Sequence, residues 1–555
     1  MRNLLLLLFF GVATATFAQK KPDAVKITYE RTSNGKYVEG QDPTIIIASA
    51  EKTEIVSAAI LAKKAPFPYE YSLLDRRSGH YNMVAQLSAG QAVITIDSVE
   101  ISKQNFTLAS DTKKILGYTC KRASTVINSN KIDVWYTDAL PFKGSPTTLG
   151  QNLGLVLQIE RNGNFAITAT KFEILKTKHS PIVHLPQGKP VDLLTYRDLL
   201  WKSRFITLPI FANEIINYTD EVKKAGDVHR FAKGTVIARK IKFPTIPPGH
   251  RIFVDAVHKS KGDAYDRTGS IFMIPDSEIS FLQALQNSPA LLPLYENGNG
   301  KKYQGVTRMA SYVPPVELMR FFTPFGISHY NTIKIKNRTW QDSITYRQDI
   351  TELATQLSGK EVWIGAGISN YDKGGHRFSA NITIHEDRAK EVYDVCLPLF
   401  QTHNVMEAAG QEYPTMFDHQ NGLLVEFELE KEVKNAVLRY IGTGHGGWEN
   451  GDEFVQKSHT ILLNGKEVHT FIPWRVDCGS YRDYNPASGN FPNGLSSSDY
   501  SRSNWCPGMV TNPHFISLGN LPAGKHRIQI RIPQGAPEGG SFSAWAVSGV
   551  LLGTH

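Results

Sequence analysis

The sequence is poor in cysteine and in long apolar runs, and each shortage excludes a class of protein. Four cysteines in 555 residues are too few for a disulfide-dense scaffold. The apolar run from Leu4 to Val12 is shorter than the roughly 20 residues that cross a bilayer, and no later run is long enough. We therefore expect no membrane span. A hydrophobic content of 41% and a charged content of 20% are typical of globular chains, and the length favours about three domains.

Charge of one sign is also not concentrated anywhere. The chain carries 61 Lys and Arg residues against 52 acids, a net charge of +9, but the basic residues form no block. A scattered excess of this kind is typical of a solvated basic surface. We therefore expect no nucleic-acid partner.

The first 18 residues have the pattern of a signal peptide. Arg2 is the basic start, the run from Leu4 to Val12 is the apolar core, and Thr16-Phe17-Ala18 ends in a small residue. Because residue 19 is Gln rather than Cys, a lipid anchor at the cut is not indicated. We expect a mature chain that begins near Gln19 and is secreted or periplasmic.

Motifs of reactive side chains are missing as well. There is no G-x-S-x-G and no paired Cys-His signature, and the 17 histidines form no H-x-H or H-E-x-x-H. His459 and His469 are better explained as strand positions of one hairpin. We therefore expect no metal ion or other cofactor, which leaves carboxylates as the candidates for catalysis.

Apolar and polar residues alternate with a period of two along most of the chain, which predicts strands. Asn162-Gly163 and Asn464-Gly465 are expected hairpin turns. The alternation breaks over 177–225, where a short helix is predicted in "VDLLTYRDLLWKS", and again near Glu386. We predict an all-β protein with two adjacent jelly-roll or β-sandwich domains that form an interdomain cleft, after a further β-rich domain. The expected boundaries are 19–180 for the N-terminal domain, 181–224 for a linker, 225–386 and 387–555 for the two jelly rolls.

Two loops combine acids, aromatic residues and glycines, one in each predicted jelly roll. "GTGHGGWENGDEFVQKSH", residues 442–459, contains Glu449, Asp452 and Glu453, and "HKSKGDAYDRTGS", residues 258–270, contains Asp266. The glycines predict irregular backbone. An acid in a glycine-rich turn is most often structural, but two such loops are more suggestive of a ligand site between domains. Asp452 and Glu449 are interpreted as solvated or turn-capping acids.

The cysteines fall into two groups. Cys478 and Cys506 flank a polar segment rich in Gly, Ser and Asn, which a disulfide between them would order by restricting the unfolded chain. Cys120 and Cys396 have no evident partner and are expected to be buried thiols.

The motifs "DAYDRTGSIFM", "ELMRFFTPFGIS", "DEFVQKSHTILLNG" and "SRSNWCPGM" occur in that order over residues 225–555. This part of the chain resembles the bacterial peptide:N-glycosidases of the F type. The N-terminal part, with "ILGYTCKRAS" and "NLGLVLQIERNGN", resembles the secreted β-rich GLPGLI family. The amidase family includes members with an extra N-terminal domain described as bowl-shaped.

The resemblance implies specific roles. The catalytic aspartate of the family falls on Asp266, followed by Arg267, its second essential acid on Glu453, and its substrate-binding arginine on Arg502. The family's loop disulfide falls on Cys478 and Cys506. The family's third glutamate has no counterpart in "VWIGAGISNY", residues 362–371, and two small disulfides beside the catalytic acids are also missing. The residues that could stack on sugar rings, or could equally well be simple β-sandwich packing, are Tyr265, Trp448 and Trp505.

The activity implied is hydrolysis of the amide between asparagine and the first N-acetylglucosamine of N-glycosylated proteins or glycopeptides. It would release the glycan as a glycosylamine and convert asparagine to aspartate, with Asp266 as general base, positioned by Arg267. Two alternatives are a carbohydrate-binding protein without catalysis and a glycosidase, which also needs two carboxyls. A binder does not need Asp266 and Glu453 together, and a glycosidase would leave asparagine on the peptide.

Overall fold

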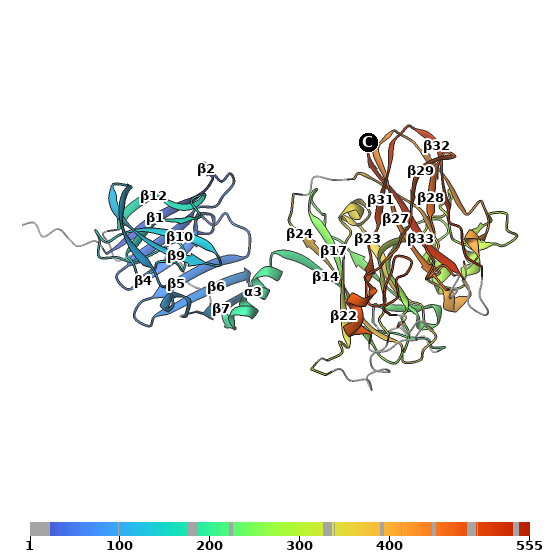
Figure 1. The fold of residues 1–555 in the computed structure, drawn as a ribbon, viewed down its shortest axis with the longest axis horizontal. Helices are drawn as coiled ribbons and strands as arrows, with labels where there is room; N and C mark the ends of the chain where they lie inside the picture. Colours follow the sequence, from blue (N-terminus) through green and yellow to red (C-terminus); the bar gives the residue numbers. More distant parts are fainter. Residues whose placement is uncertain are drawn as a thin grey trace, which may run out of the picture. The chain divides into compact units, whose positions relative to one another are not determined.

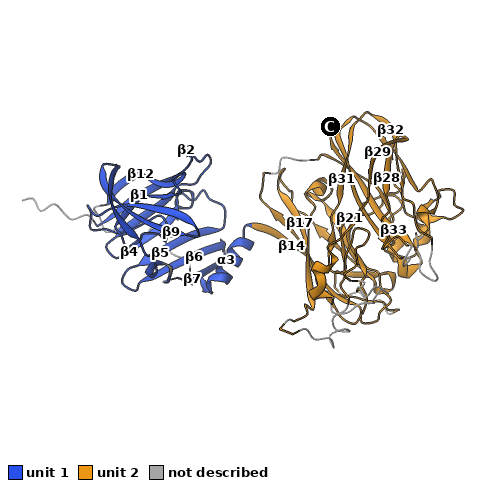
Figure 2. Ribbon diagram, in the orientation of Figure 1, with its two compact units in different colours: residues 1–204 blue, residues 205–555 orange. Residues whose placement is uncertain are grey.

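The computed structural model describes residues 23–97, 99–175, 187–220, 226–325, 336–337, 339–388, 393–411, 413, 415–446, 451–485, 496, 498–536 and 543–555. The expected signal peptide, Trp448 and Glu449 lie outside these residues. The chain divides into two compact units at Arg204/Phe205 (Figure 2). Among the described helices, none has both the length and the apolar character needed to cross a membrane.

The first unit is built on one sheet, which has 13 strands within the described residues (Figure 1). The sheet order is β13-β7-β6-β5-β4-β3-β1-β12-β11-β10-β9-β8, and β2 pairs with β1. Asn162 and Gly163 both have positive φ in the turn between β11 and β12, as a two-residue hairpin requires. The strands are β1 (Ala24–Ser33), β2 (Lys36–Tyr37), β3 (Thr44–Ser49), β4 (Lys52–Ser57), β5 (Tyr69–Asp75), β6 (His80–Ser88), β7 (Gln91–Ile96), β8 (Thr107–Ile115), β9 (Tyr118–Ile127), β10 (Asn130–Thr137), β11 (Leu155–Arg161), β12 (Phe165–Leu175) and β13 (Lys189–Pro190).

The predicted linker, residues 181–224, is largely ordered secondary structure. Its helix is α3 (Leu193–Lys202), which Asp192 caps and which buries Tyr196 and Leu200 against Ala85 and Val93 of the first sheet. Residues up to Lys202 therefore pack with the N-terminal domain, beyond its expected end at residue 180.

The C-terminal half of that predicted linker is a strand of the first sandwich. β14 (Phe205–Ile216) pairs with β24 (His376–His385), Phe205 opposite His385. The expected start at residue 225 is therefore too late. Two register shifts, between Pro209 and Glu214, interrupt β14, and a bulged strand loses the alternation from which strands are predicted.

The first sandwich consists of a four-stranded and a six-stranded sheet. Their orders are β14-β24-β17-β22 and β15-β16-β23-β18-β21-β30, and their facing side chains share one core that includes Ile252, Ile271 and Phe321. The strands not yet defined are β15 (His229–Phe231), β16 (Val236–Lys242), β17 (Arg251–Ser260), β18 (Thr268–Ile274), β21 (Val316–Phe322), β22 (Ser343–Asp349), β23 (Glu361–Ile368) and β30 (Val510–Thr511).

The second sandwich has two four-stranded sheets, β25-β33-β27-β31 and β26-β32-β28-β29, around a core that includes Leu438 and Ile528. His459 and His469 are strand residues of the β28–β29 hairpin, and Asn464 and Gly465 turn it with positive φ, as predicted. The all-β architecture with two adjacent sandwiches is thus confirmed. The strands are β25 (Val395–Gln401), β26 (Leu423–Leu429), β27 (Val433–His445), β28 (His459–Leu463), β29 (Lys466–Phe471), β31 (His514–Leu521), β32 (Gly524–Arg531) and β33 (Ala544–Thr554).

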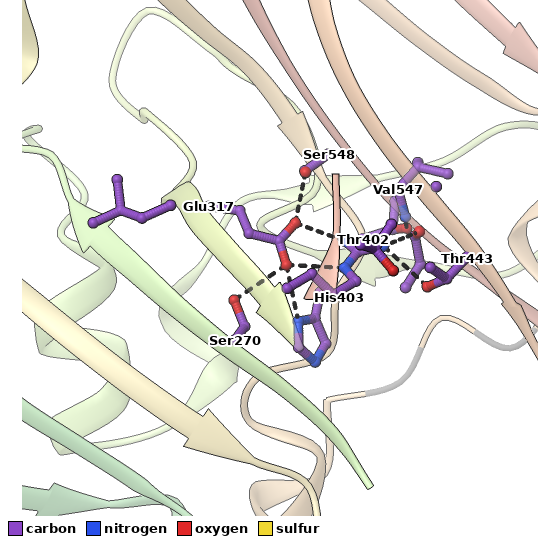
Figure 3. Close-up of polar contacts among 12 residues, drawn as sticks. Ser270, Glu317, Thr402, His403, Thr443, Val547 and Ser548 are labelled. Atoms are coloured by element: carbon purple, nitrogen blue, oxygen red, sulfur yellow. Dashed lines mark hydrogen bonds and ion pairs between the residues drawn. The ribbon is translucent and has the colours of Figure 1, made fainter. Parts of the chain in front are cut away.

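A buried polar network joins the two sandwiches. Glu317 on β21 accepts hydrogen bonds from Ser270 on β18 and from Ser548 on β33 (Figure 3). Glu317 also forms a two-point ion pair with Arg320, which donates to Thr443 on β27 at 3.0 Å. Because buried charges are costly unless they are paired, this network fixes how β21 lies against β27 and β33.

Candidate active site

Asp266 and Glu453 meet at one nitrogen atom of Arg502. The Nη1 atom of Arg502 lies 3.3 Å from Asp266 Oδ2 and 2.7 Å from Glu453 Oε1. The two carboxyls, which are 187 positions apart in sequence, are therefore neighbours in space. The structure brings together the three residues that the sequence analysis placed at the centre of the site.

Each acid comes from a loop at the end of a sandwich strand. Asp266 lies between β17 and β18, where the backbone N–H of Arg267 donates to the Thr323 hydroxyl at 2.8 Å. Glu453 follows β27, and the Ser503 N–H donates to its carbonyl oxygen at 2.9 Å. The pair thus spans the two sandwiches, with the loop of each acid tied by backbone hydrogen bonds.

Burial shifts the pKa of both acids upward. Their side chains are only 16% and 19% exposed. Burial raises the pKa of Asp266, although the charge of Arg502 opposes the rise. Burial raises the pKa of Glu453 to about 7, again against Arg502, and the neighbouring Asp266 charge adds to the rise. At neutral pH the pair can therefore hold a proton as well as a negative charge.

The guanidinium of Arg502 is held between two aromatic rings. It lies 4.3 Å from the ring centre of Trp505 and 4.9 Å from that of Phe454, distances at which cation–π attraction operates. Trp505 is 4% exposed, stacks on Phe322 at 4.4 Å and donates its indole N–H to the Gly444 carbonyl. Of the two interpretations of Trp505, the structure therefore favours packing over stacking on a sugar, because the ring is buried.

The predicted disulfide is present and lies next to Arg502 in sequence. Cys478 and Cys506 are bonded. Arg475 and Arg502 exchange two backbone hydrogen bonds, so the segments on both sides of the disulfide are paired. Cys120 is a buried free thiol, as expected, whereas the free thiol Cys396 is only half-buried.

Arg267 was expected to position Asp266 through its own side chain. Instead its guanidinium donates to both carboxylate oxygens of Asp263, at 2.7 and 3.2 Å. Asp263 is 1% exposed and also lies 3.2 Å from His376, whose other ring nitrogen contacts His258 at 2.9 Å. Burial would raise the pKa of Asp263, but His376 and Arg267 outweigh it and lower the pKa. Asp263 is therefore an ionised anchor of the loop that carries Asp266.

The Glu453 loop has its own buried anchor. Asp452 is fully buried rather than solvated, and its Oδ1 accepts from the Gly535 N–H at 2.9 Å. Burial raises the pKa of Asp452. Gly442 to His445 is the end of β27 rather than loop, and a Cβ at Gly444 would lie 2.4 Å from the Asp452 carbonyl. At Gly444, glycine is therefore needed for close packing rather than for an irregular backbone.

The remaining candidates divide by exposure. Tyr265 is 57% exposed beside the site, with the Arg267 guanidinium 5.1 Å from its ring, so a stacking role stays a prediction. Residues 362–371 end in the exposed Tyr371, and Ser369 donates to the Thr268 carbonyl, which puts this acid-free segment next to the Asp266 loop. Within the described parts of the chain, no three His, Cys, Asp or Glu side chains gather as metal ligands would.

Sequence reasoning missed several residues of this site. Asp263 lies three positions before Asp266 in the same loop, so its proximity to Asp266 was a signal in the sequence. The sequence contains no comparable signal for His376, His258 and Phe454, because their contacts with the site form only in the folded chain.

Comparison with known proteins defines the class. "N-glycanase peptide, N-terminal domain" matches residues 27–198, "Peptide-N-glycosidase F, N terminal" matches 207–384, and "Peptide-N-glycosidase F, C terminal" matches 412–552. A crystal structure of PNGF-II in space group P21 is 52% identical over 96% of this chain and 100% of that chain, with a TM-score of 0.92. Its C2 crystal form is also 52% identical, over 96% and 98%, with a TM-score of 0.85. No curated protein matches.

The fold and the matched domains are those of an N-glycanase with an additional N-terminal domain. The chain belongs to the peptide-N-glycosidase F family. The family resemblance inferred from the motifs is therefore confirmed.

Proposed function

We propose that this protein is a peptide-N4-(N-acetyl-β-glucosaminyl)asparagine amidase. The contact of Asp266 and Glu453 with the single Nη1 atom of Arg502 carries the proposal. Hydrolysis of an amide needs a base for water, positive charge near the carbonyl oxygen and a proton for the departing nitrogen. The three side chains supply these three functions in one place.

The roles follow from the environments of the two acids. Asp266 acts as general base, since burial raises its pKa and so strengthens it as a proton acceptor. Glu453, with a pKa of about 7, can hold the proton that the leaving glycosylamine needs. Arg502 contributes a fixed positive charge and hydrogen bonds. The products are the glycosylamine and a peptide in which aspartate replaces asparagine.

The substrates proposed are N-glycosylated proteins or glycopeptides met outside the cytoplasm. Support for that location is the signal-peptide pattern of residues 1–18. N-terminal sequencing of the protein from the culture medium and the periplasm tests it, with a chain that begins near Gln19 as the expected result.

The decisive experiment is the mass of the peptide product. After incubation with a denatured N-glycoprotein, an amidase yields the aspartate peptide, which differs from the asparagine peptide by –OH in place of –NH2. A product with asparagine would indicate a glycosidase. An unchanged glycopeptide that stays bound would indicate a carbohydrate-binding protein.

A further inference from the structure

A hollow lies at the seam of the two sandwiches, at the other end of their strands from the candidate active site. Its volume is about 880 Å³, and Arg251, Asp349, Val437 and Phe515 are among its lining residues. Arg251 begins β17, whereas the Asp266 loop follows the end of that strand at Ser260. Ten residues of extended chain span roughly 30 Å, so this hollow is separate from the site that contains Asp266.

The acids that line this seam groove are already neutralised. Arg251 contacts Asp349 at 3.2 Å and Asp387 at 2.7 Å. The third acid, Glu352, accepts a hydrogen bond from the buried guanidinium of Arg439 at 2.6 Å. Arg388 also lines the groove, so three guanidinium groups balance its three carboxylates. The groove therefore favours a neutral polar ligand over an ion.

An aromatic ring stands exposed inside the groove. Phe515 is 51% exposed on β31, and its partner across the strand pair is Arg439 on β27. Directly opposed residues of an antiparallel pair share one face of the sheet. Arg439 is buried and donates to the carbonyl oxygen of Glu317 in the first sandwich. The first sandwich therefore covers this face of the sheet at Arg439, whereas the same face is open to solvent at Phe515. The result is a phenyl ring on a rigid strand, in a groove rimmed by polar groups.

The polar rim has the chemistry that hydroxyl groups need. Asn512 and Ser517 line the groove, and both residues are exposed. The paired carboxylates keep further acceptor positions, because each oxygen has more than one lone pair. A pyranose ring presents an apolar face and a rim of hydroxyls, which matches one phenyl ring surrounded by amide, hydroxyl and carboxylate groups.

We propose that the seam groove is a binding site for neutral carbohydrate, distinct from the candidate active site. The proposal that carbohydrate binds there depends only on the residues of the groove. The proposal that this carbohydrate belongs to a glycosylated substrate rests on the proposed function. A glycoprotein held by one sugar in the groove would present its other glycans to the active site at raised effective concentration. A short glycopeptide with a single glycan cannot occupy the groove and the active site together, so its binding to the active site would not be strengthened.

Native mass spectrometry with the full chain tests the proposal by counting bound glycans. The probe is the pool of neutral glycans released chemically from a glycoprotein, presented to the Asp266→Asn protein. Adding Phe515→Ala, or Ser517→Trp to fill the groove, should remove one bound glycan per chain. Tyr37→Ala, an aromatic residue of similar exposure at 53%, is the matched control and should remove none.

Two further measurements separate the possible failures. In the otherwise native enzyme, Phe515→Ala should leave kcat/KM on a short glycopeptide unchanged and raise KM for a multiply glycosylated protein at least about threefold, a loss of multivalent binding. If both groove variants bind as many glycans as their parent, or if unglycosylated polypeptide occupies the groove instead, the proposal is wrong. If the groove variants lose one bound glycan but the native protein cleaves no amide, the proposed function is wrong and the proposed carbohydrate site is supported.

Discussion

Arg267, the residue after Asp266 in sequence, pairs with the buried carboxylate of Asp263 at two points. The loop of the candidate base is therefore fixed by an ion pair and by the contact between Asp263 and His376. The sequence lacks the small disulfide expected beside this acid from the family resemblance. The buried pair supplies a non-covalent constraint at the same loop.

Asp263→Asn tests whether this anchor positions the base. The change leaves the Arg267 charge without its partner, and we expect a loss of about 1–3 kcal/mol of stability and a fall in kcat. Thermal unfolding and kcat/KM on a glycopeptide measure the two effects. Asp342→Asn, which breaks an exposed pair with Lys259, is the control. A stability loss with unchanged kcat would show that Asp263 has no role in positioning.

The disulfide orders the segment that carries Arg502. Replacing Cys478 and Cys506 by serine should lower the free energy of unfolding by roughly 2–4 kcal/mol. Activity should fall with it, because Arg502 loses its fixed position. Cys396→Ala is the matched control, since that thiol is free. Full activity of the double serine variant would contradict the link between the disulfide and Arg502.

The pKa of Glu453 predicts a pH limit. Its folded pKa is raised to about 7, so the carboxyl that donates a proton is lost as the pH rises through about 7. We expect kcat/KM to decline above that pH. The raised pKa also means that the folded protein favours protonated Glu453. The stability that protonated Glu453 contributes is therefore present at low pH and is lost as the pH rises through about 7. A kcat/KM profile that stays flat well into the alkaline range would exclude Glu453 as general acid.

The ion pair of Glu317 and Arg320 predicts the opposite pH behaviour. Burial alone would raise the pKa of Glu317, but Arg320 and His403 together outweigh it and the pKa is lowered. Its stabilisation is therefore present above the ordinary glutamate range and is lost as the pH falls through the folded pKa. Glu317→Gln should cost about 3–5 kcal/mol, the effect of leaving a buried arginine unpaired. Chemical denaturation at neutral and acidic pH measures this, with the exposed Glu361→Gln as control.

Much of the fold could be predicted because strand alternation is a local signal. The hairpins at Asn162-Gly163 and Asn464-Gly465 and the break near Glu386 were read from neighbouring residues. β14 was missed because its bulges between Pro209 and Glu214 destroy the alternation. Its assignment to the first sandwich depends on pairing with β24, some 170 residues later, which no local pattern reports.

The candidate active site was likewise predicted only in part. Asp266, Glu453 and Arg502 were found from motifs, but the surroundings of each side chain were not. The motifs left open whether Trp505 stacks on a sugar or packs, and Asp452 was interpreted as a solvated or turn-capping acid. Both are buried in contacts with distant segments: Trp505 packs on Phe322, and Asp452 accepts a hydrogen bond from Gly535. Burial of a polar or aromatic side chain in a loop is decided by tertiary packing, which the sequence of the loop does not contain.

Asp266 and Glu453 should act as one unit, since both contact the same atom of Arg502. Asp266→Asn keeps the size of the side chain but removes the proton acceptor, so turnover should vanish while glycopeptide binding persists. Glu453→Gln should also lower kcat, and it should weaken binding if Glu453 contacts the first sugar. Glu449→Gln, predicted from sequence to be solvated, serves as the mild control.

The signature of a shared site is non-additivity between these two acids. Residues that serve one chemical step lose most of the rate when either is removed, so the double variant should be little slower than the slower single one. Single-turnover rates and glycopeptide affinities of the four proteins give the coupling directly. If the two losses in kcat multiply, the acids act in separate steps. If Asp266→Asn turns over at a near-normal rate, the general base lies elsewhere in the chain.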